Sequence, residues 1–395
     1  MEFSISNKSK KLVLGLISIG ALLAIVGIFT MGEGEDKFQR IMANFLIDGF
    51  FFFAIALGAL FFLALQYATE TGWYAYVKRV IEGVAGYIPV GAIILLIVFV
   101  VLSLTHGGHI YIWMDPDTVA NDHIIQNKSA YLNVPFFLIR TVIYLAVYYI
   151  FYRGFRQRSL LEDQVGGTDI HFKNYRKGAT FLVLFAVFSS TSSWDWIMSI
   201  DVHWFSTLFG WYVFAGMWTS TMVVLVILTL HLKKNGYLPK VNDSHIHDLG
   251  KWTFATSFLW SYLWFSQFML IWYSNMGEEV IYYQQRIEDF KLLYFTMFII
   301  NFALPMLMLM SREAKRNSGI LTFVGLVILA FHWVDVYMMV VPGSIGSSAS
   351  ISFFEVGLFL LFAGVFIYVV LNALTKAPLT PVNHPFLDES IHHEI

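Results

Sequence analysis

The stretch Ser189-Ser190-Thr191-Ser192-Ser193-Trp194-Asp195-Trp196 ends an apolar segment, residues 178–200, that is long enough to cross a lipid bilayer. A carboxylate inside a membrane segment is costly unless it is paired, protonated or hydrated, so such residues are rare and usually functional. The stretch His332-Trp333-Val334-Asp335 places a second acid similarly, four segments later. The two stretches indicate a membrane protein that handles protons, or a ligand that carries them, near one face of the bilayer.

The composition is that of a membrane protein. Of the 395 residues, 57% are hydrophobic and 13% are charged, whereas a soluble domain carries about 25% charged residues. The net charge of −2 gives no reason to expect nucleic acid as a partner. The chain has no cysteine, which excludes disulfides and cysteine-ligated iron–sulfur clusters. Few histidines fall within the apolar segments, so we expect the chain to bind no metal and no haem of its own.

Ten segments are predicted to cross the membrane, each with about 20 mainly apolar residues. They are residues 11–30, 43–68, 88–106, 133–153, 178–200, 207–232, 252–276, 290–310, 318–341 and 351–373. The first is interpreted as a retained anchor, because no convincing signal-peptide cleavage site follows it. We therefore expect an all-α integral membrane protein that forms a single membrane domain over residues 1–395.

The basic residues predict the orientation of these ten segments. Of the 25 Lys and Arg residues, nineteen lie in segments on the same side as the N-terminus, five lie on the other side, and Arg140 lies within a span. Basic loops stay in the cytoplasm, so both termini are predicted to be cytoplasmic. The longest loops are then residues 107–132 outside and 154–177 inside. The cytoplasmic tail, residues 374–395, is interpreted from Pro378 onward as a flexible strap or one laid on a partner.

The second to fifth and the sixth to ninth segments are predicted to form two four-helix bundles, residues 43–200 and 207–341, with the first and last segments at the periphery. The last helix of each set carries a tryptophan–acid signature. The third helix of each set is predicted to open with Asn and Pro, as Asn133-Val134-Pro135 in one and as Asn301 and Pro305 in the other. An even number of helices in each unit would make the repeat a parallel one.

Ionisable residues gather in the outer half of the predicted membrane region. Arg140 lies deep enough that we expect a carboxylate partner. His332 precedes Asp335 by three residues, so the two share a helix face. We expect Asp195 and Asp335 each to have a hydrogen-bond partner on another helix. The candidates for a proton path or a quinol site are Asp195, Asp335, His332, Arg140, His106, His203 and Glu355, with Ser193, Trp194, Trp196, Trp333, Ser257, Ser261 and Gln267 in support.

Structural interpretations remain open for these residues. Asp48, Glu278 and Glu355 are equally explained as interfacial residues near helix ends, and Asp195 and Asp335 as structural hydrogen-bonding groups. Thr253, Ser257 and Ser261 recur every four residues along one segment. Such a stripe serves either close helix packing or a hydrated proton path across the inner half of the membrane.

Three stretches carry a family resemblance: residues 192–206, which read SSWDWIMSIDVHWFS, residues 265–279, which read FSQFMLIWYSNMGEE, and residues 332–337, which read HWVDVY. They resemble the ActF-type membrane subunits of bacterial alternative complex III and, more widely, the NrfD and polysulfide-reductase membrane subunits. The resemblance implies two four-helix bundles in the bacterial inner membrane. It also implies lipid contacts and partner subunits, namely a related NrfD-like membrane subunit, a multihaem cytochrome c and an iron–sulfur protein that carry the haem c and the clusters.

The expected function is that of a cofactor-free subunit of a respiratory quinol:electron-acceptor oxidoreductase. Such a subunit would contribute to the binding of quinol, such as menaquinol, or quinone, or to a proton path coupled to quinol oxidation, and would not be catalytic alone. Two other functions fit the residues. One is a structural scaffold paired with a related quinol-binding subunit, and the other is an independent proton-coupled transporter.

Overall fold

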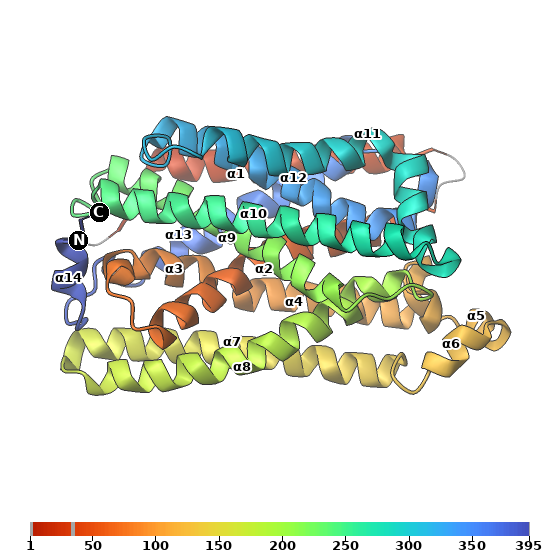
Figure 1. Cartoon of the computed structure of the whole chain (residues 1–395), viewed down its shortest axis with the longest axis horizontal. Coiled ribbons are helices and arrows are strands. Elements are labelled where there is room, and N and C mark those ends of the chain that lie inside the picture. The colour runs from red at the N-terminus through yellow and green to blue at the C-terminus, as the bar shows by residue number, and fades with distance from the viewer. Residues whose placement is uncertain (1–2, 33–35, 395) are drawn as a thin grey trace.

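The computed structural model describes residues 3–32 and 36–394, and the regular structure within these ranges is helical (Figure 1). Counting α3 and α4 together, nine helices of the described residues are long and apolar enough to cross a membrane. The chain is therefore a multi-pass integral membrane protein. These nine helices are α1 (Asn7–Thr30), α2 (Lys37–Ala68), α3 (Lys78–Ala85) with α4 (Ile88–Leu104), α7 (Val134–Val165), α8 (Asp169–Trp196), α9 (Leu208–Lys234), α11 (Gly277–Met308), α12 (Ser318–Ser344) and α13 (Phe353–Leu374). A further long helix, α10 (Asp243–Ser274), is not among the nine.

Both chain ends lie at the same end of the long helices, which we call the terminal end (Figure 1). The opposite end, which we call the far end, carries α5 (Pro116–Asn121) and α6 (His123–Lys128). The shorter elements are η1 (Trp73–Tyr76), η2 (His106–His109), η3 (Ile112–Met114), η4 (Met198–Ile200), η5 (Gly346–Ser348) and α14 (Leu387–Ile391).

The helices close two rings of four. In the first ring, α2 contacts α4, α4 contacts α7, α7 contacts α8, and α8 returns to α2. In the second ring, α9, α10, α11 and α12 contact one another in the same cyclic order. Helix α2 also contacts α9 and α12, so it joins the rings, and its apolar stretch is buried throughout. A helix that is apolar on all sides is expected at such a central position.

Polar residues fix where these helices begin. The side chain of Asn133 accepts a hydrogen bond from the backbone N–H of Phe136 at 3.0 Å, and Pro135 occupies the first turn of α7. Asn301 and Pro305 instead lie inside α11, far from its start at Gly277. The predicted match between these two Asn–Pro pairs is therefore wrong, because hydropathy shows only the apolar part of α11 and conceals its polar first turns.

The predicted inner loop, residues 154–177, is also wrong. Helix α7 continues to Val165 and α8 starts at Asp169, so the turn is confined to residues 166–168. Gly166 and Gly167 have φ values of 69° and 75°, which are left-handed conformations that glycine adopts without strain. The charged residues on either side lie on helices that extend past the apolar region, and a search for apolar runs does not detect such helices.

The C-terminal residues are not a flexible tail. Residues 375–394, which we call the tail strap, follow α13 and include α14. The Asp163 carboxylate accepts a hydrogen bond from the N–H of Val382 at 3.0 Å, and the Asn383 amide donates to the Asp163 carbonyl at 2.9 Å. The Ser390 hydroxyl donates to the carbonyl of Trp73 at 2.6 Å. The strap is thus hydrogen-bonded to the terminal end of its own chain.

Glycines allow α1 and α13 to pack closely as a peripheral pair. A Cβ atom at Gly357 would lie 2.3 Å from the backbone nitrogen of Ala24, and one at Gly20 would lie 2.4 Å from that of Leu361. Gly27 and Gly364 make similar close approaches. Small residues at helix interfaces let backbones approach in membranes, where the hydrophobic effect does not hold helices together.

We expect Gly357→Leu to separate α1 from α13 and to lower the free energy of unfolding by about 1–3 kcal/mol, because the added side chain collides with backbone that cannot rotate away. The measurement is thermal unfolding of the detergent-solubilised chain. Gly15→Leu is the matched control, since a Cβ at Gly15 meets no atom within 4 Å. Equal melting temperatures for the two variants would show that the α1–α13 contact does not contribute to stability.

Candidate functional site

Asp195, at the end of α8, is held in an ion pair with α7. Arg140 donates from Nε to one carboxylate oxygen at 2.8 Å and from Nη2 to the other at 2.9 Å. The Tyr144 hydroxyl also donates to Asp195 at 3.0 Å, and the guanidinium lies over the ring of Tyr131. The prediction that Arg140 has a carboxylate partner is confirmed. A guanidinium and a phenol thus bond to both carboxylate oxygens of Asp195.

The adjacent Trp196 belongs to the same structural unit. Its Nε1 donates to the hydroxyl of Thr141 at 3.0 Å, and its carbonyl accepts a hydrogen bond from Tyr111 at 2.5 Å. Trp194 is only half-buried, and among the described residues its Nε1 has no hydrogen-bond partner. These contacts tie the end of α8 to α7 and to Tyr111, the residue that precedes η3.

Asp335, on α12, has a different environment. Among the described residues, its hydrogen-bond donors are the Tyr212 hydroxyl on α9 and the Trp260 indole on α10, the latter at 2.9 Å. The Nδ1 atom of His332 lies 3.9 Å from Asp335 Oδ2, and neither ring nitrogen of His332 has a hydrogen-bond partner within the described chain. Asp335 is thus a buried acid held by neutral donors, with an unsatisfied histidine beside it.

Three small cavities lie in this region, and Asp335 lines one of them. The central cavity, of about 20 Å³, is lined by His332, Asp335 and Ser220. The serine cavity, also about 20 Å³, is lined by Ser192 and Ser193. A cavity needs about 10–15 Å³ to hold one water molecule, so each has room for one. Phe50, Ala54, Val213 and Met217 line both cavities.

The third cavity, which we call the arginine cavity, has a volume of about 10 Å³ and lies toward α11. Gln267, Arg286 and Tyr212 line it, and Met339 lines both this cavity and the central one. The three cavities therefore follow one another from α11, past Asp335 and His332, to the hydroxyl run of α8. The oxygen of Gln267 and both nitrogens of His332, which lack partners among the described residues, are groups that water in these cavities would satisfy.

The hydroxyl groups along α10 donate hydrogen bonds to backbone carbonyls of the same helix. Thr253 donates to the carbonyl of Leu249 at 3.0 Å, Ser257 to that of Thr253 at 2.8 Å, and Ser261 to that of Ser257 at 2.8 Å. All three hydroxyl residues are buried, and α9 and α11 pack against α10. These intrahelical hydrogen bonds and the burial of the stripe favour its interpretation as a surface for close helix packing.

Glu355, another candidate, forms a structural clamp. Arg40 donates to both of its oxygens, at 2.8 and 3.0 Å, and Glu355 completes a capping box with Ser352 at the start of α13. Asp48 is fully buried rather than interfacial, and one of its oxygens accepts from the Trp333 indole at 2.6 Å. Trp333 thus links α12 to α2. Hydropathy alone suggested an interfacial position for Asp48, whereas the structure buries this acid.

His106 and His203 lie outside the buried site. His106 is exposed in η2. His203 is also exposed and pairs with Asp122 at 2.6 Å, and this contact, with backbone N–H donors, lowers the pKa of Asp122. His106 and His332 therefore occupy different environments, one at the surface and one in the core.

Arg286 is a buried residue of the site that the sequence placed in an outer loop. It lies over the ring of Tyr282 and donates to Asp201 at 3.1 Å and to the carbonyl of Met338 at 3.1 Å. No charge pattern in the sequence identified this residue, because it lies in the polar first turns of α11. Its guanidinium supplies a fixed positive charge beside the arginine cavity.

No protein-family model matches the chain, and no curated protein sequence is significantly similar to it. The fold and the site therefore define a class only: a helical, multi-pass integral membrane protein with a buried acid–histidine pair beside water-sized cavities.

Proposed function

We propose that this chain is a membrane subunit of a respiratory quinol:electron-acceptor oxidoreductase of the alternative complex III type, carries no redox cofactor, and provides a proton path. The observation that carries the proposal is Asp335, a buried acid with neutral donors, next to His332 and the central cavity. A proton path needs groups that change protonation state and spaces for water between them. The sequence resemblance supplies the link to quinol oxidation.

The volumes of the three cavities favour a proton path over quinone binding at Asp335, while a larger hollow of about 500 Å³ lies apart from them, beside Trp252 and His393. Pockets for small organic ligands measure about 300–1,000 Å³, whereas the three cavities measure about 10–20 Å³ each. A related NrfD-like membrane subunit would then hold the quinol, and the multihaem cytochrome c and iron–sulfur protein would carry the electrons. In this proposal Asp195 has a structural role, because both of its carboxylate oxygens are bonded to Arg140.

The proposal includes ten membrane spans with both termini in the cytoplasm. Within residues 3–32 and 36–394, nine helices satisfy the length and apolarity criteria, and α10 is long enough to be the tenth. Because both termini lie at the same end of the bundle, the chain must cross the membrane an even number of times (Figure 1). The excess of basic residues at the terminal end supports this proposed cytoplasmic orientation.

The test is Asp335→Asn in the assembled complex. Asparagine keeps the size, its one oxygen can accept from the Trp260 indole, and its NH2 group can donate to the Tyr212 hydroxyl oxygen, but it cannot exchange a proton. We expect normal assembly and at least about a tenfold loss of proton-coupled quinol oxidation, as for removal of other proton-transfer groups. Quinol-driven cytochrome reduction and proton release by proteoliposomes are the measurements.

Glu278→Gln is the matched control, because Glu278 is an exposed acid at the far end. It should leave turnover and proton release unchanged. Normal turnover and coupling in a well-assembled Asp335→Asn complex would refute the proton path and leave a scaffolding role. Proton-driven transport by the isolated chain, independent of quinol, would instead identify a transporter.

A further inference from the structure

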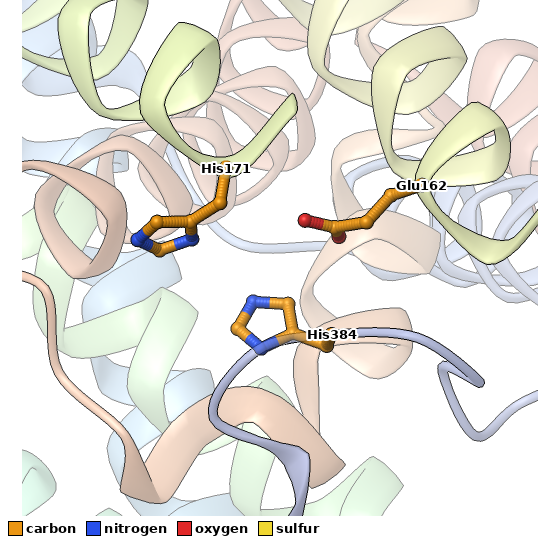
Figure 2. Close-up of side chains that lie close together, drawn as sticks. All are labelled: Glu162, His171 and His384. Carbon is orange, nitrogen blue, oxygen red and sulfur yellow. The ribbon is translucent and has the colours of Figure 1, made fainter. Parts of the chain in front are cut away.

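A second buried polar cluster lies at the terminal end. Glu162 comes from the last turn of α7, His171 from the first turn of α8, and His384 from the tail strap, and the three side chains converge on a common space (Figure 2). One ligand atom from each lies within 4.8 Å of the others, and all three residues are at most 4% exposed. This cluster takes no part in the proposed proton path.

Several atoms of the cluster have no hydrogen-bond partner among the described residues. They are one carboxylate oxygen of Glu162, both ring nitrogens of His171 and Nε2 of His384. Each such buried atom costs about 1–3 kcal/mol. Unsatisfied groups rarely gather in one place unless a water molecule or an ion occupies the space between them.

We propose that Glu162, His171 and His384 bind a divalent transition-metal ion, with zinc as the best match. Two imidazoles and one carboxylate, with a water molecule in the fourth position, are a known zinc ligand set. Ligand atoms around tetrahedral zinc lie about 3.4 Å apart, given bonds of about 2.0–2.2 Å. Small side-chain rotations would close the present separations to that value. Zinc has no redox chemistry, so it is compatible with a subunit that carries no redox cofactor.

Neighbouring groups leave the required atoms available. Nε2 of His171 faces Glu70 at 3.4 Å, so Nδ1 points to the site, in the carboxylate–histidine–metal arrangement typical of zinc proteins. Lys78 occupies one oxygen of Glu162 at 2.7 Å and leaves the other unpaired. Nε2 of His384 has no hydrogen-bond partner among the described residues, so its lone pair can bind a metal once the ring proton lies on Nδ1.

Two costs oppose metal binding. The ammonium of Lys78 repels a dication, although Glu70 and Glu162 offset that repulsion. In addition, Nδ1 of His384 accepts a hydrogen bond from the N–H of Phe386 at 3.2 Å. When Nε2 binds the metal, the ring proton moves from Nε2 to Nδ1 and this bond is lost. Binding would fasten the tail strap to the α7–α8 hairpin, because the ion links residues far apart in the chain.

This proposal replaces the sequence-based expectation that the chain binds no metal. That expectation rested on the missing cysteines and on the few histidines of the apolar segments. His171 and His384 lie outside those segments, and no short spacing in the sequence brings them to Glu162.

The experiment is equilibrium dialysis of the detergent-solubilised full chain against zinc chloride, followed by metal analysis. We expect one zinc ion per chain, and with cobalt in its place the visible absorption bands of a tetrahedral ion. His171→Ala and His384→Ala should each lose the bound ion. His392→Ala is the matched control, because His392 belongs to the same strap but is exposed, and it should retain the metal.

The wild-type measurement does not depend on whether a variant folds. Failure of the wild-type chain to retain zinc would overturn the proposal. Equal zinc loss in the His392 and His384 variants would also overturn it, since it would indicate adventitious surface binding only.

Lys78→Met gives an independent test. Removing the competing ammonium leaves Glu162 without its cation, so zinc affinity should rise by about tenfold or more. An unchanged or weaker affinity in a folded Lys78→Met chain would contradict a metal at the free oxygen of Glu162.

Discussion

Arg140→Met is expected to lower the free energy of unfolding by about 3–5 kcal/mol, because it leaves the buried Asp195 carboxylate without its cation. The side-chain volume is nearly kept, so the loss reflects charge rather than packing. Tyr144 would remain as a donor to Asp195, but it carries no charge. The measurement is unfolding of the detergent-solubilised chain, followed by tryptophan fluorescence.

The control is Arg153→Met, because Arg153 lies on the same helix and is exposed. Its effect should stay within about 0.5 kcal/mol. The double variant Arg140→Met, Asp195→Leu should recover much of the loss, since apolar replacement of a whole buried ion pair is often neutral. A double variant no more stable than Arg140→Met would show that the ion pair fixes the packing of α7 on α8 in a way that apolar side chains cannot replace.

The positions of the membrane helices could be predicted because an apolar run of about 20 residues has few physical alternatives. The predicted segments 207–232 and 318–341 correspond to α9 and α12 within three residues at each boundary. The expectation that Asp195 and Asp335 bond to other helices is confirmed by their contacts with α7, α9 and α10. A lone buried carboxylate is too costly, so partners had to exist.

The choice of partners could not be predicted. Asp195 and Asp335 share a tryptophan–acid signature in the sequence, yet in the structure one has a guanidinium partner and the other has a phenol and an indole. The difference arises because Arg140 comes from the helix beside Asp195, whereas the corresponding guanidinium, Arg286, bonds to Asp201 and backbone carbonyls. Hydropathy gives the depth of a residue along its helix and carries no information on which neighbour it faces.

The terminal end was predicted least well, because its polar residues were assigned to loops. Lys78 and Arg79 were counted only as inner basic residues. In the structure Arg79 donates to Glu82 at 2.9 Å and also pairs with Asp163, and both cations are buried. A charged residue is expected in water unless a partner compensates it. Glu82 lies on the same helix as Arg79, but Glu162, which pairs with Lys78, and Asp163 come from α7, and their approach depends on tertiary packing.

Acidification is expected to release the C-terminal part of the tail strap between about pH 6.5 and pH 4. His245, in the first turn of α10, lies against Ser390 of the strap at 3.3 Å. Burial lowers its pKa from 6.5 to about 4, with a further lowering by His393 and Lys233 that Asp248 partly offsets. The strap is also held here by Asn242, which donates to the His393 carbonyl, and by the His393–Asp248 pair.

The direction of this pH effect follows from the linkage between proton binding and docking of the strap. The docked state keeps His245 neutral down to about pH 4, whereas the released state protonates it near pH 6.5. The contribution of His245 to docking is therefore fully present above pH 6.5 and is lost as the pH falls toward 4. A difference of about 2.5 pH units corresponds to about 3 kcal/mol.

The chain has no cysteine, so Asp388→Cys, at a side chain in the C-terminal part of the strap that is 92% exposed, provides a unique site for a fluorescent probe. Its anisotropy should fall as the strap detaches with decreasing pH. In His245→Gln, which preserves the capping box of α10 with Asn242, the transition should shift downward by at least one pH unit. His392→Gln, at an exposed strap residue, should leave the transition unchanged. If the His245 and His392 variants release at the same pH as the parent chain, another group controls docking, with His393 and Asp248 the nearest titratable pair.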